Sequence, residues 1–123
     1  MTLIAGRLVV AKEIISSGGE RAMPRLAIIV TIEVAPGRRD QLLPLLMAHR
    51  ARCLKDEHGI TLEFEVLVPY EDETKVLSYE VYRDEGAFEV HRNGRSIAQF
   101  REDTAGMIVK MHMTKYAPQA PLP

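Results

Sequence analysis

Apolar and polar residues alternate along three stretches of this chain with the period of two that β-strands produce. The alternation runs from Leu26 to Val34, from Leu62 to Val68 and from Lys75 to Tyr82. Each stretch gathers apolar side chains on one face, so the pattern predicts three strands. A fourth strand is predicted at about Val109–Tyr116.

Apolar residues recur at helical spacing between these strands. A long helix is predicted from about Asp40 to Glu57, with Gly59 as its C-cap. Its apolar stripe consists of Leu42, Leu46, His49 and Cys53. Asp84 is a suitable N-cap for a second helix, which Asn93–Gly94 interrupts before a further helical segment at about Ser96–Ile108.

The predicted order is strand, helix, strand, strand, split helix, strand. This is the ferredoxin-like βαββαβ arrangement, an α+β fold with an antiparallel sheet whose helices cover one face only. The strands nevertheless carry apolar groups on both faces, as Ile28 and Ile29 or Val76 and Leu77 illustrate. Because a second copy of the same sheet is the simplest cover for the other face, we expect a homodimer through the open sheet face.

The two ends of the chain differ from this central unit, which spans residues 26–116. Residues 1–25 contain two short apolar patches followed by Ser16-Ser17-Gly18-Gly19, and either an extra strand or a loosely held arm fits that pattern. Residues 117–123 hold three prolines, which predicts an extended tail.

Composition narrows the function classes. Lys plus Arg total 16 and Asp plus Glu total 17, a formal net charge of −1, so a nucleic-acid partner is not expected. A single cysteine, Cys53, forms no internal disulfide, and no apolar run reaches the ~20 residues that span a bilayer. The N-terminus also lacks a signal-peptide pattern, so we expect a cytoplasmic protein without a membrane partner.

Candidate chemistry concentrates in residues 79–92. The predicted strand carries Glu80 and Tyr82, and the helix that follows places His91 on its inward face, one turn after Phe88. A titratable imidazole at a seam between helix and sheet is suited to proton chemistry in a small pocket.

Four segments together resemble the antibiotic biosynthesis monooxygenase (ABM) superfamily. They are Val34-x-Pro-Gly, the helix ending at Glu57-His-Gly, Leu62-x-Phe-x-Val-Leu-Val and Tyr79-Glu-Val-Tyr-Arg-Asp-Glu-x-Ala-Phe-x-x-His91, within about residues 26–116. The resemblance implies a dimeric α+β barrel with a pocket between helices and sheet. It also implies oxygenation of phenolic or quinol-like compounds without metal or flavin. The superfamily includes an isomerase branch acting on a phosphorylated autoinducer sugar, and haem-degrading enzymes.

The chain departs from the family pattern at two points. Many members carry a second histidine five residues after the first, and that position is Ser96 here. Any mechanism that needs the second imidazole is therefore placed in doubt. The chain also contains no tryptophan, which disfavours haem breakdown, because the haem degraders use one.

His91 is the candidate catalytic base, and Glu80 is a candidate to orient it or to bind substrate. The alternatives are a structural histidine and a cross-strand ion pair. The candidate substrate-binding residues are His49, Phe64, Tyr82, Phe88, Phe100 and Arg83. For most of these residues, core packing or an ordinary surface position is the alternative.

Neither a metal nor a cofactor is expected from the sequence. The four histidines show no metal-ligand spacing, and no glycine-rich phosphate loop or dinucleotide fingerprint is present. Cys53 is interpreted as a buried, inert thiol, since no histidine spacing argues for a catalytic pair.

Three functions remain open. The first is a cofactor-independent monooxygenase acting on a small aromatic molecule, with His91 as base. The second is an isomerase of a small dicarbonyl or phosphorylated sugar, with Arg83, Arg92 and Arg95 as anion clamp. The third is a non-catalytic dimeric ligand-binding or stress-related module. A cavity beside His91 that Leu46, Phe88 and Phe100 do not fill would favour the first two.

Overall fold

Residues 24–120 are the part of the chain that the computed structural model describes. The elements in chain order are β2 (Leu26–Val34), α1 (Arg39–Asp56), β3 (Thr61–Leu67), β4 (Lys75–Tyr82), α2 (Glu85–Arg92), α3 (Arg95–Asp103) and β5 (Ile108–Tyr116). This order confirms the ferredoxin-like α+β fold. The alternating apolar patterns gave the bounds of β2 and β4 to the residue, because a strand packed between neighbours shows the period of two most clearly.

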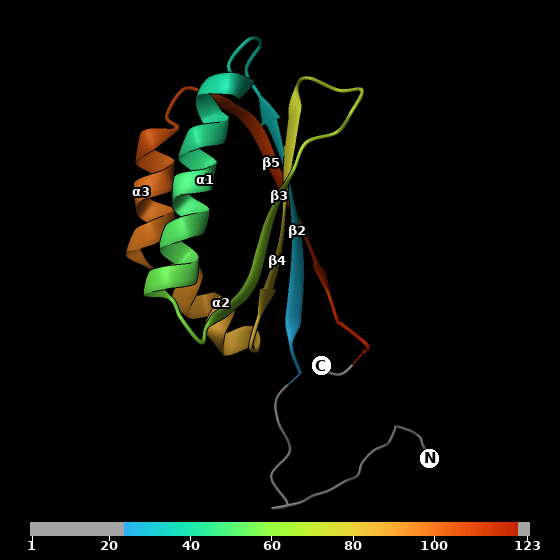
Figure 1. Cartoon of the computed structure of the whole chain (residues 1–123), viewed down its shortest axis with the longest axis vertical. Coiled ribbons are helices and arrows are strands. Elements are labelled where there is room, and N and C mark those ends of the chain that lie inside the picture. Colours follow the sequence, from blue (N-terminus) through green and yellow to red (C-terminus); the bar gives the residue numbers. More distant parts are fainter. Residues whose placement is uncertain (1–23, 121–123) are drawn as a thin grey trace, which may run out of the picture.

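The strands form one antiparallel sheet in the order β3-β4-β2-β5. Figure 1 shows α1 and α3 side by side over one face of this sheet. The short helix α2 lies at the end of the sheet where β4 ends. Ile28 pairs with Glu80, and Phe64 pairs with the same Glu80 from the other side. This register places a carboxylate under the helices, among apolar neighbours.

The predicted stripe of α1 is its buried face. Leu42, Leu46, His49 and Cys53 are its four buried residues. The first two and Cys53 belong to the main apolar core, which also contains Ile32, Val34, Phe64, Val76 and Phe100. Two of the four stripe residues, His49 and Cys53, have titratable side chains. Because they lie on the buried face of α1, the helix places an imidazole and a thiol in the core.

The split helix also follows the predicted signals. The Asp84 carboxylate caps α2 by accepting a hydrogen bond from the Ala87 N–H at 2.7 Å. Gly94 is the N-cap of α3, so the predicted break at Asn93–Gly94 is confirmed. α3 ends at Asp103, five residues earlier than predicted. The reason is a turn closed by the Met107 N–H and Thr104 C=O at 2.9 Å, in which Gly106 has φ +84°.

The end of α1 differs from the prediction as well. Its last residue is Asp56 and its C-cap is Glu57, whereas Gly59 lies two residues beyond the cap with φ +83°. The glycine serves the turn into β3, and the residue at the end of α1 is a carboxylate.

The face of the sheet that carries no helix holds half-buried apolar side chains, among them Ile29, Leu77 and Tyr79. The predicted N-terminal arm, residues 1–25, lies almost entirely outside the described residues, as do the last three residues of the predicted tail. Within residues 24–120, no helix has the length and apolar character needed to cross a membrane.

Candidate active site

A cavity of about 230 Å³ lies between the helices and the sheet, beside His91. The predicted residues His49, Phe64, Glu80, Phe88, His91 and Phe100 all line it. Leu46, Phe88 and Phe100 therefore form walls and do not fill the seam. Toward β5 the lining includes Met111 and Met113, whose side chains are 47% and 40% exposed, so this side of the cavity is the more open one.

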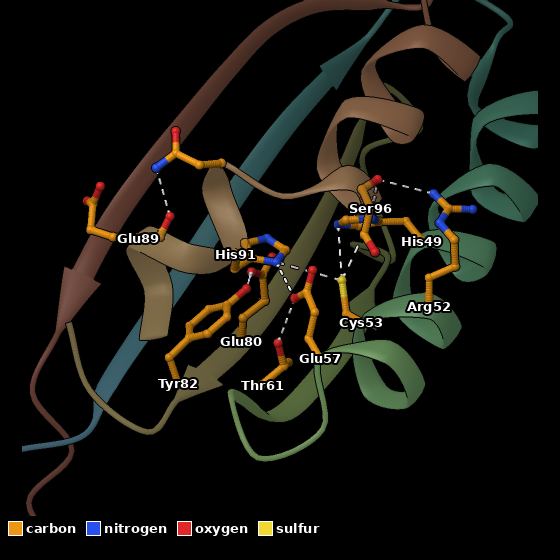
Figure 2. Close-up of polar contacts among 11 residues, drawn as sticks. His49, Arg52, Cys53, Glu57, Thr61, Glu80, Tyr82, Glu89, His91 and Ser96 are labelled. Atoms are coloured by element: carbon orange, nitrogen blue, oxygen red, sulfur yellow. Dashed lines mark hydrogen bonds and ion pairs between the residues drawn. The ribbon is translucent and has the colours of Figure 1, made fainter. Parts of the chain in front are cut away.

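His91 is held by a carboxylate from a distant part of the chain. Its Nδ1 lies 2.7 Å from Glu57 Oε1, with the two side chains only 4% and 12% exposed. Thr61 Oγ1 donates to the same oxygen at 3.2 Å. Because a carboxylate accepts, we assign the His91 proton to Nδ1, which leaves Nε2 with the free lone pair. Figure 2 shows the carboxylate of Glu57, the C-cap of α1, pointing at the imidazole.

Glu80 is engaged on both of its oxygens by other residues. Ser78 Oγ donates to Oε2 and the Tyr82 hydroxyl donates to Oε1, each at 2.6 Å (Figure 2). No hydrogen bond joins Glu80 to His91 in the described part of the chain. Glu57, and not the predicted Glu80, is therefore the carboxylate that is hydrogen-bonded to His91. Burial, followed by the charge of Glu80, raises the pKa of Tyr82 far above its ordinary value, so the phenol remains a donor.

His49 and Cys53 lie one helical turn apart on α1 and meet His91 in the core. The distance from Cys53 Sγ to His49 Nε2 is 3.6 Å, and that to His91 Nδ1 is 3.8 Å. The Ser96 carbonyl oxygen lies 3.2 Å from His49 Nδ1. Burial, then the charges of His91 and Arg52, lowers the pKa of His49 to about 4, so this imidazole is neutral at pH 7. Burial likewise raises the pKa of the Cys53 thiol, which keeps it protonated.

This arrangement corrects one interpretation of the sequence. His49 and Cys53 were not recognised as a pair, although residues four apart on a helix share one face. Cys53 is fully buried, as expected for an unreactive thiol, but its sulfur contacts two imidazoles rather than hydrocarbon alone.

Two predicted substrate-binding residues do not line the cavity. Tyr82 is fully buried beneath Phe88 and His91, with ring centroids at 5.3 and 5.1 Å, and its hydroxyl donates to Glu80. Arg83 lies beyond the end of β4, where it donates to the Gly59 carbonyl at 3.1 Å and lies near Asp84.

Of the three arginines considered for an anion clamp, only Arg92 lines the cavity. Arg95 lines a separate hollow, together with Ser96 and Glu57. The sequence reading missed Arg101, a second guanidinium of the cavity. The available signal was its position four residues after Ile97, which puts both residues on the same face of the helix that carries Phe100.

Comparisons with known proteins agree with this fold. A 23% identical crystal structure from Pseudomonas aeruginosa superposes with a TM-score of 0.74, over 82% of this chain and 100% of that one. Candidate antibiotic biosynthesis monooxygenases from Bacteroides thetaiotaomicron and Nitrosomonas europaea are 20% and 14% identical, with TM-scores of 0.72 and 0.74. They cover 80% and 85% of this chain and 92% and 99% of their own.

These solved structures establish a shared fold. Among curated protein sequences, no significant match to this chain is found. The profile of the antibiotic biosynthesis monooxygenase family matches residues 25–103, which contain the whole Glu57, Glu80 and His91 arrangement. The chain therefore belongs to the antibiotic biosynthesis monooxygenase family.

Proposed function

We propose that this protein is a cofactor-independent oxygenase of a small aromatic or quinol-like molecule, with His91 as the catalytic base. The observation that carries the proposal is His91, which lines a largely apolar cavity and is held by the Glu57 carboxylate at 2.7 Å. A base oriented by a second group, next to space for a small molecule, is the arrangement that proton abstraction requires.

Glu57 has a defined part in this chemistry. By accepting the Nδ1 proton it keeps His91 in the tautomer whose Nε2 is free to take a proton from the substrate. Once Nε2 is protonated, the imidazolium carries a positive charge beside the Glu57 carboxylate, which stabilises it. The role is the same in kind as that of the carboxylate in a hydrolase triad.

The reaction balances without a further reductant. His91 removes the proton of a phenolic hydroxyl, and the resulting electron-rich anion transfers electrons to dioxygen. One oxygen atom forms the new carbon–oxygen bond, and the other leaves as water when the quinone forms. A phenol and dioxygen thereby give a quinone and water, and the substrate is the only compound oxidised.

The cavity walls contribute position and dryness. The rings of Phe64, Phe88 and Phe100 provide flat apolar surfaces for an aromatic substrate. Holding the anion away from water keeps it reactive toward dioxygen and orients the carbon that is attacked. Glu80 keeps Ser78 and Tyr82 in place beneath the cavity, which makes it a supporting group in this proposal.

The proposal is tested by oxygen consumption with a panel of phenols, quinols and enolisable aromatic ketones. We expect uptake above the uncatalysed rate for at least one compound, with one atom of ¹⁸O₂ in the product. The matched control is the same mixture without oxygen, in which no turnover is expected. If compounds of the panel bind to the protein but none of them is oxidised, the proposal is contradicted. That result would favour a non-catalytic ligand-binding module.

An isomerase is the second candidate, because two guanidinium groups, Arg92 and Arg101, line the cavity. They could hold a phosphate or carboxylate while His91 moves a proton between two carbons. This reaction needs no oxygen. Turnover that continues unchanged under anaerobic conditions would therefore favour the isomerase over the oxygenase.

A twofold dimer through the helix-free face of the sheet is also part of the proposal. Ile29 and Tyr79 are cross-strand partners there, next to the half-buried Leu77. Light scattering is expected to give twice the 13.8 kDa chain mass.

Leu77→Lys should shift the protein toward monomer, because it places a charge in the interface. Val90→Lys, at an exposed position of α2, should leave the mass unchanged. A wild-type protein with the mass of one chain would contradict the dimer.

A further inference from the structure

Three ligand-type side chains meet at the wall of the cavity, to which two of them belong. His49 and Cys53 from α1 and His91 from α2 are all buried, and one ligand atom from each lies within 4.8 Å of the other two. Figure 2 shows the two imidazoles on either side of the Cys53 sulfur. Two nitrogens and one sulfur form a donor set that soft and borderline transition metals prefer.

We propose that His49, Cys53 and His91 form a binding site for a thiophilic divalent metal ion such as Zn²⁺. In tetrahedral zinc sites with Zn–S of about 2.3 Å and Zn–N of about 2.0–2.1 Å, the sulfur and nitrogen atoms are about 3.5 Å apart. The observed separations from Cys53 Sγ are 3.6 Å to His49 Nε2 and 3.8 Å to His91 Nδ1. Both sulfur–nitrogen separations are thus within a few tenths of an ångström of the tetrahedral value.

The orientation of His49 supports the same assignment. Its Nδ1 lies 3.2 Å from the Ser96 carbonyl oxygen, which can only accept a hydrogen bond. The proton therefore sits on Nδ1, and Nε2, which lies 3.6 Å from Cys53 Sγ, keeps the lone pair. A histidine that donates one N–H to a backbone carbonyl and presents its other nitrogen is the usual form of a metal ligand.

The three ligand atoms come from His49, Cys53 and His91. Beside them lies the carboxylate of Glu57. Its Oε1 is 2.7 Å from His91 Nδ1, on the atom that would bind the metal. When the metal enters, Nδ1 and the Cys53 thiol each release one proton, and the Glu57 carboxylate stays as a negative charge next to the ion. A thiolate and a carboxylate then neutralise the two positive charges of the ion, which a buried site requires.

The metal-bound form and the catalytic form exclude each other. His91 Nδ1 cannot donate its proton to Glu57 and bind a metal at the same time. We therefore expect Zn²⁺ to suppress any activity that uses His91 as base. The site itself does not depend on the proposed function, because the ligand geometry remains if the protein has a different activity or none.

The test uses the full chain, freed of metal by chelation, and Co²⁺ as the spectroscopic probe in place of Zn²⁺. Wild type is expected to give a thiolate-to-cobalt charge-transfer band in the near ultraviolet, visible bands of tetrahedral strength, and a stoichiometry of one. Excess Zn²⁺ should remove all of these bands by displacement. No substrate is present, so the result is independent of the proposed function.

The decisive variants are Cys53→Ser and His49→Gln. Cys53→Ser should lose the charge-transfer band, and each variant should bind Zn²⁺ at least about 10²-fold more weakly by calorimetry. His112→Gln, at an exposed histidine of β5, should bind like wild type. Circular dichroism checks that each variant is folded. If Cys53→Ser does not fold, the Zn²⁺ affinity of His49→Gln tests the proposal. Equal affinity of wild type and the folded variants, or no thiolate band in wild type, would overturn the proposal.

Discussion

His91→Gln is expected to lower kcat by about 10²–10⁴-fold for the compound that the oxygen-uptake panel identifies. Glutamine has similar size and polarity but cannot accept a proton, so the contribution of a positioned general base is lost. KM should change much less than kcat, because the imidazole acts on the reacting proton rather than on the bulk of the substrate. Steady-state oxygen consumption measures both parameters.

Glu57→Gln separates the base from its orienting group. The amide can accept from Nδ1 through its oxygen but carries no charge to stabilise the imidazolium, so a smaller fall in kcat is expected. His58→Gln, one residue further along at an exposed position, is the matched control and should leave kcat unchanged. If His91→Gln oxidises every substrate at the wild-type rate, His91 is not the base.

Tyr82→Phe is expected to lower the free energy of unfolding at pH 7 by about 2–3 kcal/mol. The Tyr82 hydroxyl is one of two donors to the buried Glu80 carboxylate, at 2.6 Å. Removing a hydrogen bond to a charged group costs about 1.5–3 kcal/mol, because the acceptor stays buried without its partner. Denaturation in urea measures the change, and Tyr79→Phe, on the helix-free face, should cost less than about 0.5 kcal/mol.

The same residue predicts how stability depends on alkaline pH. An unfolded tyrosine ionises near pH ~10, whereas burial raises the pKa of Tyr82 in the folded state. The unfolded chain therefore loses this proton first, and the stabilising contribution of Tyr82 is present below pH ~10 and lost above it. The difference in stability between wild type and Tyr82→Phe should accordingly narrow above pH ~10. A difference that stays constant from pH 7 to pH ~11 would contradict this prediction.

The parts of the fold that could be predicted from the sequence are those governed by local periodicity. The alternation in β2 and β4 and the stripe of α1 report which side chains leave water, and burial of apolar groups dominates that choice. The N-cap at Asp84 was equally readable, because a cap concerns a carboxylate and an N–H three residues away. The end of α3 was not, since its pattern continued past the turn at Gly106.

The candidate site also has a part that the sequence could predict and a part that it could not. His91, Phe88 and Glu80 lie on elements whose buried face was evident, so their presence at the seam was predictable. The pairing of His91 with Glu57 joins residues 34 positions apart, and the sequence favoured the carboxylate that was nearer along the chain. Arg101 was missed for a related reason. Its spacing of four from Ile97 shows which face of α3 it lies on, but not that a cavity lies beneath that face.

By itself, therefore, the sequence determined the elements, their buried faces and the presence of two inward-facing imidazoles, His49 and His91. Only the tertiary structure decided that Glu57 and not Glu80 holds the His91 imidazole, that the seam leaves a cavity, and that Cys53 lies between two histidines. The physical reason is that periodicity records whether a side chain is buried. Which buried polar groups meet depends on how α1 and α2 pack on the sheet.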